Sequence, residues 1–480
     1  MPTKLKLWID GKPVGALSGR TFPVVNPADG KVLATVAEGG AEDVDAAARA
    51  AAKAASGPWG RTSARGRARV LFAIARLIRE NADELALLET RNAGKPLADA
   101  RDEIGLAADV FEYYAGAATK HFGETIPVGA SGLDFTLREP VGVCALIVPW
   151  NFPLVIAAWK LAPALACGNT MVLKPAPETP LTALRLAELC AEAGLPDGVL
   201  NVVPGPGPGC GSALVAHPLV RKVSFTGSTA TGTAIMKSAA DGLKRVSLEL
   251  GGKSPNVVFD DADLDLCVEK SVWSVFGNAG QDCCARSRAI VHRKVYDAFV
   301  ARFVARAKKI VLGHPEKKGS QMGPLISPRQ LERVRGYVES GKSQGAELLC
   351  GGTRPGGALA KGYYLTPAVF AGAEAGMKIV REEIFGPVVT IMPFKDEAEA
   401  VRLANDSPYG LSGSLWTRDV GRVLRVTRAV QAGVISVNSS SSVHLEAPFG
   451  GYKSSGVGRE LGLKALDLYS EIKNVFVSNV

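Results

Sequence analysis

Residues 141–175 read VGVCALIVPWNFPLVIAAWKLAPALACGNTMVLKP. Both ends of this stretch, 141–149 and 170–175, are apolar, which predicts two buried strands. The Ala- and Leu-rich segment Leu154–Leu165 between them predicts a helix. A strand, a helix and a strand in succession are typical of a parallel sheet with helices on both faces.

The same alternation continues on both sides of this stretch. Residues 41–118 are rich in Ala, Leu, Arg and Glu at helical spacing, which predicts a helical layer packed on the sheet. After Gly252 the alternation restarts and indicates a second α/β domain. The other predicted strands are 199–204, 220–227, 245–252, 254–261, 288–292, 368–372, 387–394, 413–417 and 433–438, and the other predicted helices are 181–193, 230–238, 263–276, 296–310, 328–343, 397–404 and 421–429.

The composition narrows the possible functions. The chain has 480 residues, of which 47% are hydrophobic and 21% charged, which is typical of a globular protein with a large core. The net charge is +9, but the basic residues are dispersed and aromatics make up only 6%, so we predict no nucleic-acid partner. Eight cysteines without a CxxC pair favour a reducing compartment, the cytoplasm. The uncharged run 141–159 is interrupted by Pro149 and Pro153, so we predict no membrane segment.

The loop FGNAGQDCCARSR (276–288) contains a candidate nucleophile. It lies between a predicted helix and a predicted strand, where a thiol is accessible and can be ionised by backbone dipoles. Cys283 is therefore a candidate for covalent catalysis. A structural cysteine is the alternative, and the loop alone does not choose between the two.

Two polar side chains follow predicted buried strands. Glu249 ends an apolar strand, where burial would raise the pKa of its carboxyl and make it a general base. The alternative is a solvated strand-end glutamate. Asn151 lies in the turn PWNFP (149–153), and its NH2 group could donate to an oxyanion or merely support its own turn.

Three segments bear on nucleotide binding. FTGST (225–229) joins a strand to a helix, so its backbone N–H groups would face a phosphate, although it is no GxGxxG motif. Lys174 ends a strand where a doubly wound sheet usually holds a ribose, with a solvated lysine as the alternative. GPGPG (205–209) is interpreted as a rigid loop because its prolines lack amide donors. No metal site is predicted, because the histidines are isolated and no Cys/His spacing occurs.

Seven segments occur in one order along the chain: PWNFP, the strand end at Lys174, FTGST, LELGGKSPN, GQDCC, EEIFGP and PFGGYKSSGVGRE. In this order they closely resemble the aldehyde dehydrogenase superfamily over essentially the whole chain. The resemblance implies an α/β fold with two doubly wound open-sheet domains and a small β oligomerisation flap, assembled as a homodimer or homotetramer. The implied units are a Rossmann-like cofactor domain (1–117 and 141–251), a catalytic domain (252–469) and the flap (118–140 and 470–480).

The resemblance also implies NAD(P)-dependent oxidation of a small-molecule aldehyde to a carboxylic acid. Cys283 matches the nucleophile that forms a thiohemiacetal and then a thioester. Asn151, with the Cys283 backbone N–H, matches the oxyanion hole, and Glu249 matches the base that activates water. Lys160 and Glu460 match residues that support proton relay near that base.

The expected cofactor is NAD, with NADP possible. Lys174 matches the contact to the adenosine ribose. In many NAD-preferring members a Glu stands three residues after this lysine, whereas here that position is Pro177 and the acid is displaced to Glu178. A carboxylate there would repel a 2′-phosphate, so its displacement predicts some NADP acceptance. The remaining cofactor contacts match Trp150, Gly227, Ser228, Glu383 and Phe385.

The substrate pocket is expected to include Phe152, Ile156, Trp159, Asp282 and Phe449. Asp282 departs from many members, which carry an apolar or small residue before the nucleophile. An acid there raises the pKa of the thiol and would favour a polar or cationic aldehyde. The alternative is that Asp282 points to solvent.

Two other activities use the same residues. CoA-acylating aldehyde dehydrogenases generally lack a carboxylate at the Glu249 position, so Glu249 favours hydrolysis. A Cys-dependent esterase would use Cys283 and Glu249 without a cofactor, and only cofactor-dependent turnover separates it from a dehydrogenase. The intact set of Cys283, Asn151 and Glu249 disfavours a non-catalytic protein on this scaffold.

Overall fold

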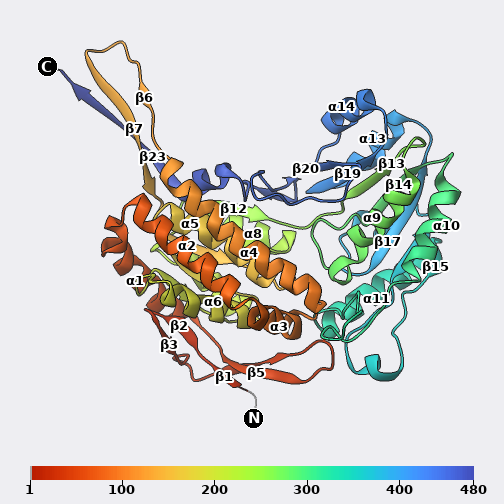
Figure 1. Cartoon of the computed structure of the whole chain (residues 1–480), viewed down its shortest axis with the longest axis horizontal. Helices are drawn as coiled ribbons and strands as arrows, with labels where there is room; N and C mark the ends of the chain where they lie inside the picture. Colours follow the sequence, from red (N-terminus) through yellow and green to blue (C-terminus); the bar gives the residue numbers. More distant parts are fainter. Residues whose placement is uncertain (1–2, 480) are drawn as a thin grey trace.

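The computed structural model describes residues 3–479, which form two α/β lobes and a projecting β arm (Figure 1). The first lobe is built on an eight-stranded sheet. In spatial order its strands are β22 (Gly456–Val457), β12 (Arg245–Glu249), β11 (Val220–Thr226), β8 (Val143–Ile147), β9 (Thr170–Lys174), β10 (Leu200–Val202), β2 (Leu7–Ile9) and β3 (Lys12–Val14).

The order of the strands in this sheet determines where a ligand binds. The five strands from β12 to β10 are parallel, and the chain winds outward from β8 in both directions. The strand order therefore reverses between β8 and β11, and ligands of such sheets bind outside the carboxyl ends of the strands at this point. The turn PWNFP follows β8, and Gly227 and Ser228 follow β11, so both segments lie at the expected binding edge.

Helices cover both faces of this sheet, as predicted. They are α1 (Ala41–Ser56), α2 (Ala64–Glu80), α3 (Ala82–Ala93), α4 (Leu97–Ala117), α5 (Pro153–Ala166), α6 (Leu181–Glu192), α7 (Ser212–Ala216) and α8 (Thr229–Ala240). Along β8, Cys144 and Leu146 join the core formed with α2–α6, whereas Val143 and Ala145 join the core formed with α1, α7 and α8. The predicted helical layer of residues 41–118 is therefore divided between the two faces, because α1 packs opposite α2–α4.

Strands near the N-terminus were not predicted. β2 and β3 extend the first sheet, and β1 (Thr3–Leu5), β4 (Thr21–Val25) and β5 (Val32–Ala37) form a separate three-stranded sheet. These strands are only three to six residues long, so they contain too few alternating positions to produce a periodic signal.

The second lobe is built on a seven-stranded sheet and has a hydrophobic core of its own. In spatial order its strands are β15 (Glu347–Cys350), β16 (Ala368–Ala371), β17 (Val388–Phe394), β14 (Arg288–His292), β13 (Pro255–Val258), β19 (Ser412–Trp416) and β20 (Val434–Val437). Its helices are α9 (Leu264–Phe276), α10 (Tyr296–Ala307), α11 (Pro328–Ser343), α12 (Lys378–Arg381), α13 (Glu397–Asn405) and α14 (Val420–Ala429). The six predicted strands of this lobe are confirmed, and β15 adds an antiparallel edge. Two short strands, β18 (Tyr409–Gly410) and β21 (Tyr452–Lys453), pair separately.

The chain returns to the first lobe near its end. β22 pairs with β12, and Leu466 and Tyr469 lie in the core of the first lobe, although these residues fall within the range expected for the second domain. The last strand, β23 (Ser470–Ser478), pairs antiparallel with β7 (Gly132–Pro140), which also pairs with β6 (Thr125–Ile126). These three strands form the projecting arm in Figure 1. The C-terminal strand is thus held by β7 of the same chain.

The uncharged run 141–159 forms β8, a turn and the first half of α5, as predicted. Within residues 3–479, no helix has both the length and the apolar character needed to cross a membrane.

Candidate active site

Cys283 lies in a loop with an unusual backbone. Asn278, Ala279 and Gly280 follow α9 with φ angles of 48°, 54° and 71°, three consecutive left-handed residues. At Gly280 an added Cβ would lie 2.1 Å from the carbonyl oxygen of Gly386, so only glycine fits there. This tight reversal presents Cys283 at the carboxyl edge of the first sheet, away from the second core.

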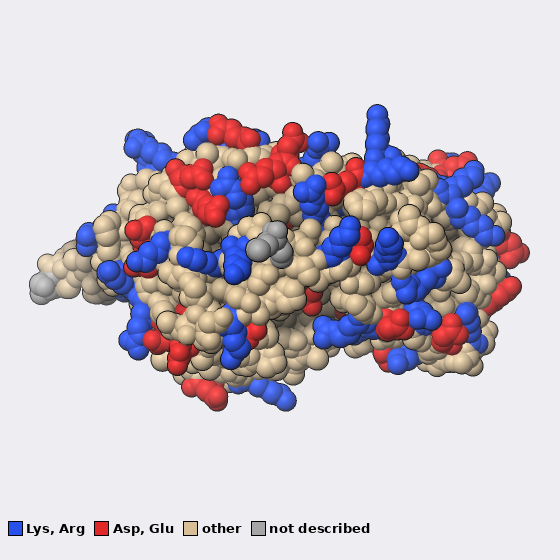
Figure 2. Space-filling model, turned by 90° about the horizontal axis from the view of Figure 1, so that it is seen from below, with Lys and Arg blue, Asp and Glu red and all other residues tan. Residues whose placement is uncertain are grey.

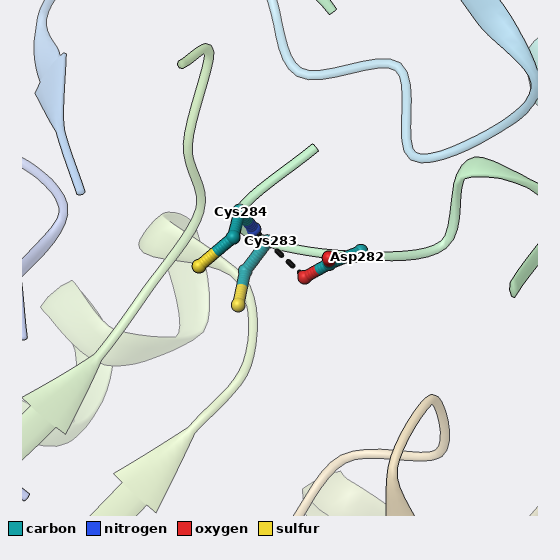
Figure 3. A group of neighbouring side chains, drawn as sticks. All are labelled: Asp282, Cys283 and Cys284. Atoms are coloured by element: carbon teal, nitrogen blue, oxygen red, sulfur yellow. Dashed lines mark hydrogen bonds between the residues drawn. The ribbon is translucent and has the colours of Figure 1, made fainter. Parts of the chain in front are cut away.

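Figure 3 shows Asp282, Cys283 and Cys284 together, with the two sulfur atoms on the same side of the loop. The Asp282 carboxylate accepts a hydrogen bond of 2.8 Å from the Cys284 backbone N–H. Contact with the Cys284 thiol, followed by burial and by the charges of Cys284 and Asp282, raises the pKa of the Cys283 thiol well above its ordinary value. These surroundings favour the neutral thiol of Cys283 over the thiolate.

The same three side chains form a group of metal-ligand type in the described chain, with ligand atoms within 4.8 Å of one another. Cys/His spacing did not indicate this cluster, because its residues are simply adjacent. The group includes the candidate nucleophile, and a thiolate bound to a metal could not attack a carbonyl. The expectation that no metal binds here therefore stays a prediction.

Asn151 is fixed against the Cys283 loop. Its side chain is buried, and its Nδ2 donates one hydrogen bond of 3.0 Å to the carbonyl oxygen of Gln281. An amide NH2 group has two hydrogens, so one remains to donate to a reacting group. This is the arrangement that the oxyanion interpretation requires.

Glu249 is a buried carboxyl at the end of β12. Its Oε2 has no hydrogen-bond partner among the described residues. Burial, followed by the nearby charge of Glu460, raises the pKa of Glu249 well above its ordinary value. The solvated strand-end alternative is therefore wrong.

Lys160 and Glu460 form a buried ion pair near Glu249. Lys160 also donates to the Ser224 hydroxyl at 3.1 Å, which in turn donates to Glu460 at 3.2 Å. A chain of buried polar groups thus begins near the candidate base.

Three adjoining cavities connect the predicted residues. The first, of about 250 Å³, is lined by every expected pocket residue: Phe152, Ile156, Trp159, Asp282 and Phe449. The second, of about 560 Å³, shares Thr226, Glu249 and Cys283 with the first. The third, of about 890 Å³, shares Trp150, Thr226 and Gly227 with the second and reaches Lys174. Cys283 and Glu249 thus lie where a compact apolar cavity meets a long groove.

The sequence profile of the aldehyde dehydrogenase family matches residues 14–475. The chain belongs to this family. The mitochondrial aldehyde dehydrogenase of Rattus norvegicus is 47% identical over 476 residues, which are 98% of this chain and 91% of that protein. The NAD+ complex structure of aldehyde dehydrogenase from Bacillus cereus is 46% identical with a TM-score of 0.98, covering 99% of this chain and 97% of that one. Betaine aldehyde dehydrogenase from Staphylococcus aureus, in complex with NAD+, is 40% identical with a TM-score of 0.98, covering 99% and 95%.

This aldehyde dehydrogenase is an NAD(P)-dependent oxidoreductase, and NAD is its cofactor. The groove fits a dinucleotide. Ser228 caps the N-terminus of α8, where backbone N–H groups attract a phosphate, and Thr226 Oγ1 is buried without a partner among the described residues. At Gly227 an added Cβ would meet the Phe225 ring at 2.5 Å, so the backbone turn has no room for a side chain.

The two ends of the groove differ in charge. Lys174 is buried at one end, and burial lowers the pKa of its amine. At the other end Glu383 accepts a hydrogen bond of 3.0 Å from the Gly252 backbone, and burial raises its pKa to about 7. Phe385 packs edge-to-face on Trp150 with ring centroids 5.1 Å apart. Each residue that the sequence assigned to the cofactor therefore lines the groove.

Three carboxyl groups, those of Glu103, Glu249 and Asp282, line the substrate cavity of this dehydrogenase. Asp282 lines the cavity instead of pointing to bulk solvent, and burial raises the pKa of its carboxyl. Glu103 from α4 also lines the cavity and was not predicted. The sequence could have indicated Glu103, because it is an acidic residue on the apolar face of α4, beside buried Ala100, Ile104 and Ala107. Other lining residues that were not predicted are Leu106, Val155 and Ser274 in the substrate cavity and Arg329, Gln330 and Arg333 in the groove.

Proposed function

We propose that this chain oxidises an aldehyde through a thioester on Cys283, which water activated by Glu249 then hydrolyses to the carboxylic acid. The observation that most supports this mechanism is that Cys283 and Glu249 line the wall shared by the substrate cavity and the cofactor groove. A nucleophile and a base at such a junction can act in turn on one carbon atom.

In the first step the Cys283 thiol gives its proton to water, and the sulfur attacks the aldehyde carbon, whose oxygen becomes an oxyanion. The second N–H of Asn151 and the backbone N–H of Cys283 are the proposed donors to that charge. Because Gln281 already fixes the Asn151 amide, this donor needs no reorganisation when the charge develops.

NAD, when bound, supplies the oxidant by accepting hydride from the substrate carbon. The residues proposed to hold it line the groove from end to end. Lys174 would contact the adenosine ribose, and Glu383, with Phe385 beside it, the nicotinamide ribose. The proposed pyrophosphate contacts are Trp150, Gly227 and Ser228.

In the last step Glu249 takes a proton from water, the water oxygen attacks the thioester carbon, and the carbon–sulfur bond breaks so that Cys283 leaves as the thiolate. The proton held by Glu249 is then returned to the Cys283 sulfur, and the buried Lys160–Glu460 pair would support this transfer. We favour hydrolysis over CoA acylation, because a buried base near Cys283 can activate water. In CoA acylation the thiol of CoA attacks the thioester in place of water. An esterase using the same residues would need no groove for a dinucleotide.

The test is formation of reduced nicotinamide with a panel of aliphatic, aromatic, amino and semialdehyde substrates, with NAD and NADP side by side. We expect turnover with NAD and slower turnover with NADP. Glu178 lines the groove and its charge opposes a 2′-phosphate, but Pro177 occupies the position where a carboxylate would hold the ribose. Strict use of NAD would refute NADP acceptance, and an absence of nicotinamide reduction together with ester hydrolysis would favour the esterase.

We propose further that Asp282 selects polar or cationic aldehydes. An Asp282→Val variant is expected to lower kcat/KM for amino- and hydroxyaldehydes about tenfold relative to aliphatic aldehydes of equal length, because a charge-assisted hydrogen bond is lost. Burial raises the pKa of Asp282, so this preference should strengthen with rising pH as the carboxylate forms. Asp282→Asn is the matched control for size. An unchanged ranking of substrates would show that Asp282 does not contact them.

We also propose that the arm joins subunits into a homodimer or homotetramer. Leu133, Leu137, Ile472 and Phe476 are exposed on it, which is costly for an isolated strand ribbon. Deletion of residues 470–480 should reduce the mass measured by light scattering, and the paired variant Ile472→Lys with Phe476→Lys should do so without removing a strand. An unchanged mass in both would refute the proposal.

The surface supports the prediction that no nucleic acid binds. On the face in Figure 2, Lys and Arg side chains are interspersed with Asp and Glu. All eight cysteines, each within the described residues, are free thiols, which supports the proposed reducing compartment, the cytoplasm. Subcellular fractionation of the source cells would test this location.

A further inference from the structure

Lys95 is a buried lysine close to the proposed oxyanion site, and the mechanism above does not use it. It follows Gly94, whose φ of 82° turns the chain sharply after α3. The Lys95 side chain is 0% exposed. A lysine is almost never fully buried without a partner, so its contacts define its role.

The Lys95 amine touches the turn that holds Asn151. Its Nζ donates a hydrogen bond of 2.9 Å to the carbonyl oxygen of Asn151 and lies 4.6 Å from the centre of the Phe152 ring. The same carbonyl accepts a second bond of 3.1 Å from Asn278 Nδ2, which also donates to the Gln281 carbonyl. The Asn151 side chain donates to that Gln281 carbonyl as well. Lys95 thus completes a closed set of bonds that joins the turn to the Cys283 loop.

The charge of Lys95 is balanced by carboxyls on one side. Glu103 forms an ion pair with the amine, and Asp99 and Glu89 also interact with its charge. Glu103 lines the substrate cavity, so the pair connects the wall of the cavity to the backbone of Asn151. Glu89 instead accepts from the Leu154 backbone at the start of α5 and from the Thr182 hydroxyl at the start of α6.

We propose that Lys95, held by Glu103, is a positioning residue that fixes Asn151 for stabilisation of the oxyanion. This inference rests on the proposed function of Asn151. Lys95 acts through the Asn151 backbone, and its position beside the substrate cavity lets the Lys95–Glu103 pair respond to the bound substrate.

A double-mutant cycle separates positioning from general stability. Asn151→Ala should lower the first-turnover rate of reduced-nicotinamide formation about 100-fold, as loss of an oxyanion donor does. Lys95→Met should lower it about tenfold, since a displaced catalytic group loses rate. In the Asn151→Ala background, Lys95→Met should change the rate less than about twofold, because the group that it positions is already gone.

Two further variants complete the design. Glu103→Gln keeps the shape of the side chain and leaves the Lys95 amine in place, and it should show the same non-additivity with a smaller loss. Thr182→Val removes a 2.7 Å hydrogen bond to Glu89 in the same buried cluster and should lower Tm while leaving the first-turnover rate within about twofold.

The outcomes distinguish a failure of the proposed role of Asn151 from a failure of the proposed role of Lys95. If Asn151→Ala leaves the rate unchanged, the proposed role of Asn151 fails. If Asn151→Ala slows the reaction but Lys95→Met and Glu103→Gln each slow both backgrounds equally, or slow neither, positioning by Lys95 is refuted.

Discussion

Replacement of Cys283 by alanine is expected to lower aldehyde oxidation at least about 10⁴-fold, because removal of a covalent nucleophile leaves only the contributions of binding and of the oxyanion donors. The protein should stay folded, since Cys283 is partly exposed to the cavity and only its sulfur is removed. Steady-state formation of reduced nicotinamide measures the loss, and titration of NAD by calorimetry should show unchanged binding.

The matched control is Cys190→Ala, a buried cysteine in α6 outside the three cavities. It should cost stability but retain activity within about twofold. If Cys283→Ala stays active while Cys284→Ala is inactive, the adjacent thiol would be the nucleophile and the assignment would be wrong.

Replacement of Glu249 by glutamine is expected to separate the two halves of the reaction. The first turnover should still yield about one equivalent of reduced nicotinamide per active site, because hydride release needs no base at this position. Steady-state turnover should then fall about 10²- to 10⁴-fold, the usual contribution of a general base. Stopped-flow absorbance would show a burst followed by a very slow phase.

The pH dependence has a defined sign. Burial raises the pKa of Glu249, so the carboxylate that accepts the proton becomes more abundant as pH increases. Steady-state turnover limited by hydrolysis should therefore rise with pH in the native enzyme and be flat in Glu249→Gln. Glu446→Gln changes an exposed glutamate three residues before Phe449 of the cavity wall and should keep the native profile. A rising profile in Glu249→Gln would show that another base activates water.

Much of the site was predictable because its residues follow buried strands. Asn151 follows β8, Gly227 and Ser228 follow β11, and Glu249 ends β12, so the parallel topology brings them to one edge. Sequence motifs with prolines and glycines mark such turns, because the backbone there has few alternatives. The doubly wound order of the sheet then decides which of these turns meet.

Other parts could not be predicted from local pattern. The return of β22 to the first sheet depends on packing between segments about 200 residues apart. The Lys160–Glu460 pair likewise joins positions 300 residues apart. Lys95 and Glu103 lie in an ordinary charged region of sequence, and only the fold shows that both are enclosed. The cavity-facing position of Asp282 likewise depends on the left-handed turn before it, whose φ angles no motif specifies.

Mass spectrometry of the Glu249→Gln enzyme tests whether a thioester forms on Cys283. After brief mixing with aldehyde and NAD and quenching in acid, the peptide that contains Cys283 should carry one acyl group, and samples without NAD or with Cys283→Ala should carry none. An acyl group on another residue, or full reduction of one equivalent of NAD without any acyl-enzyme, would rule out a thioester on Cys283.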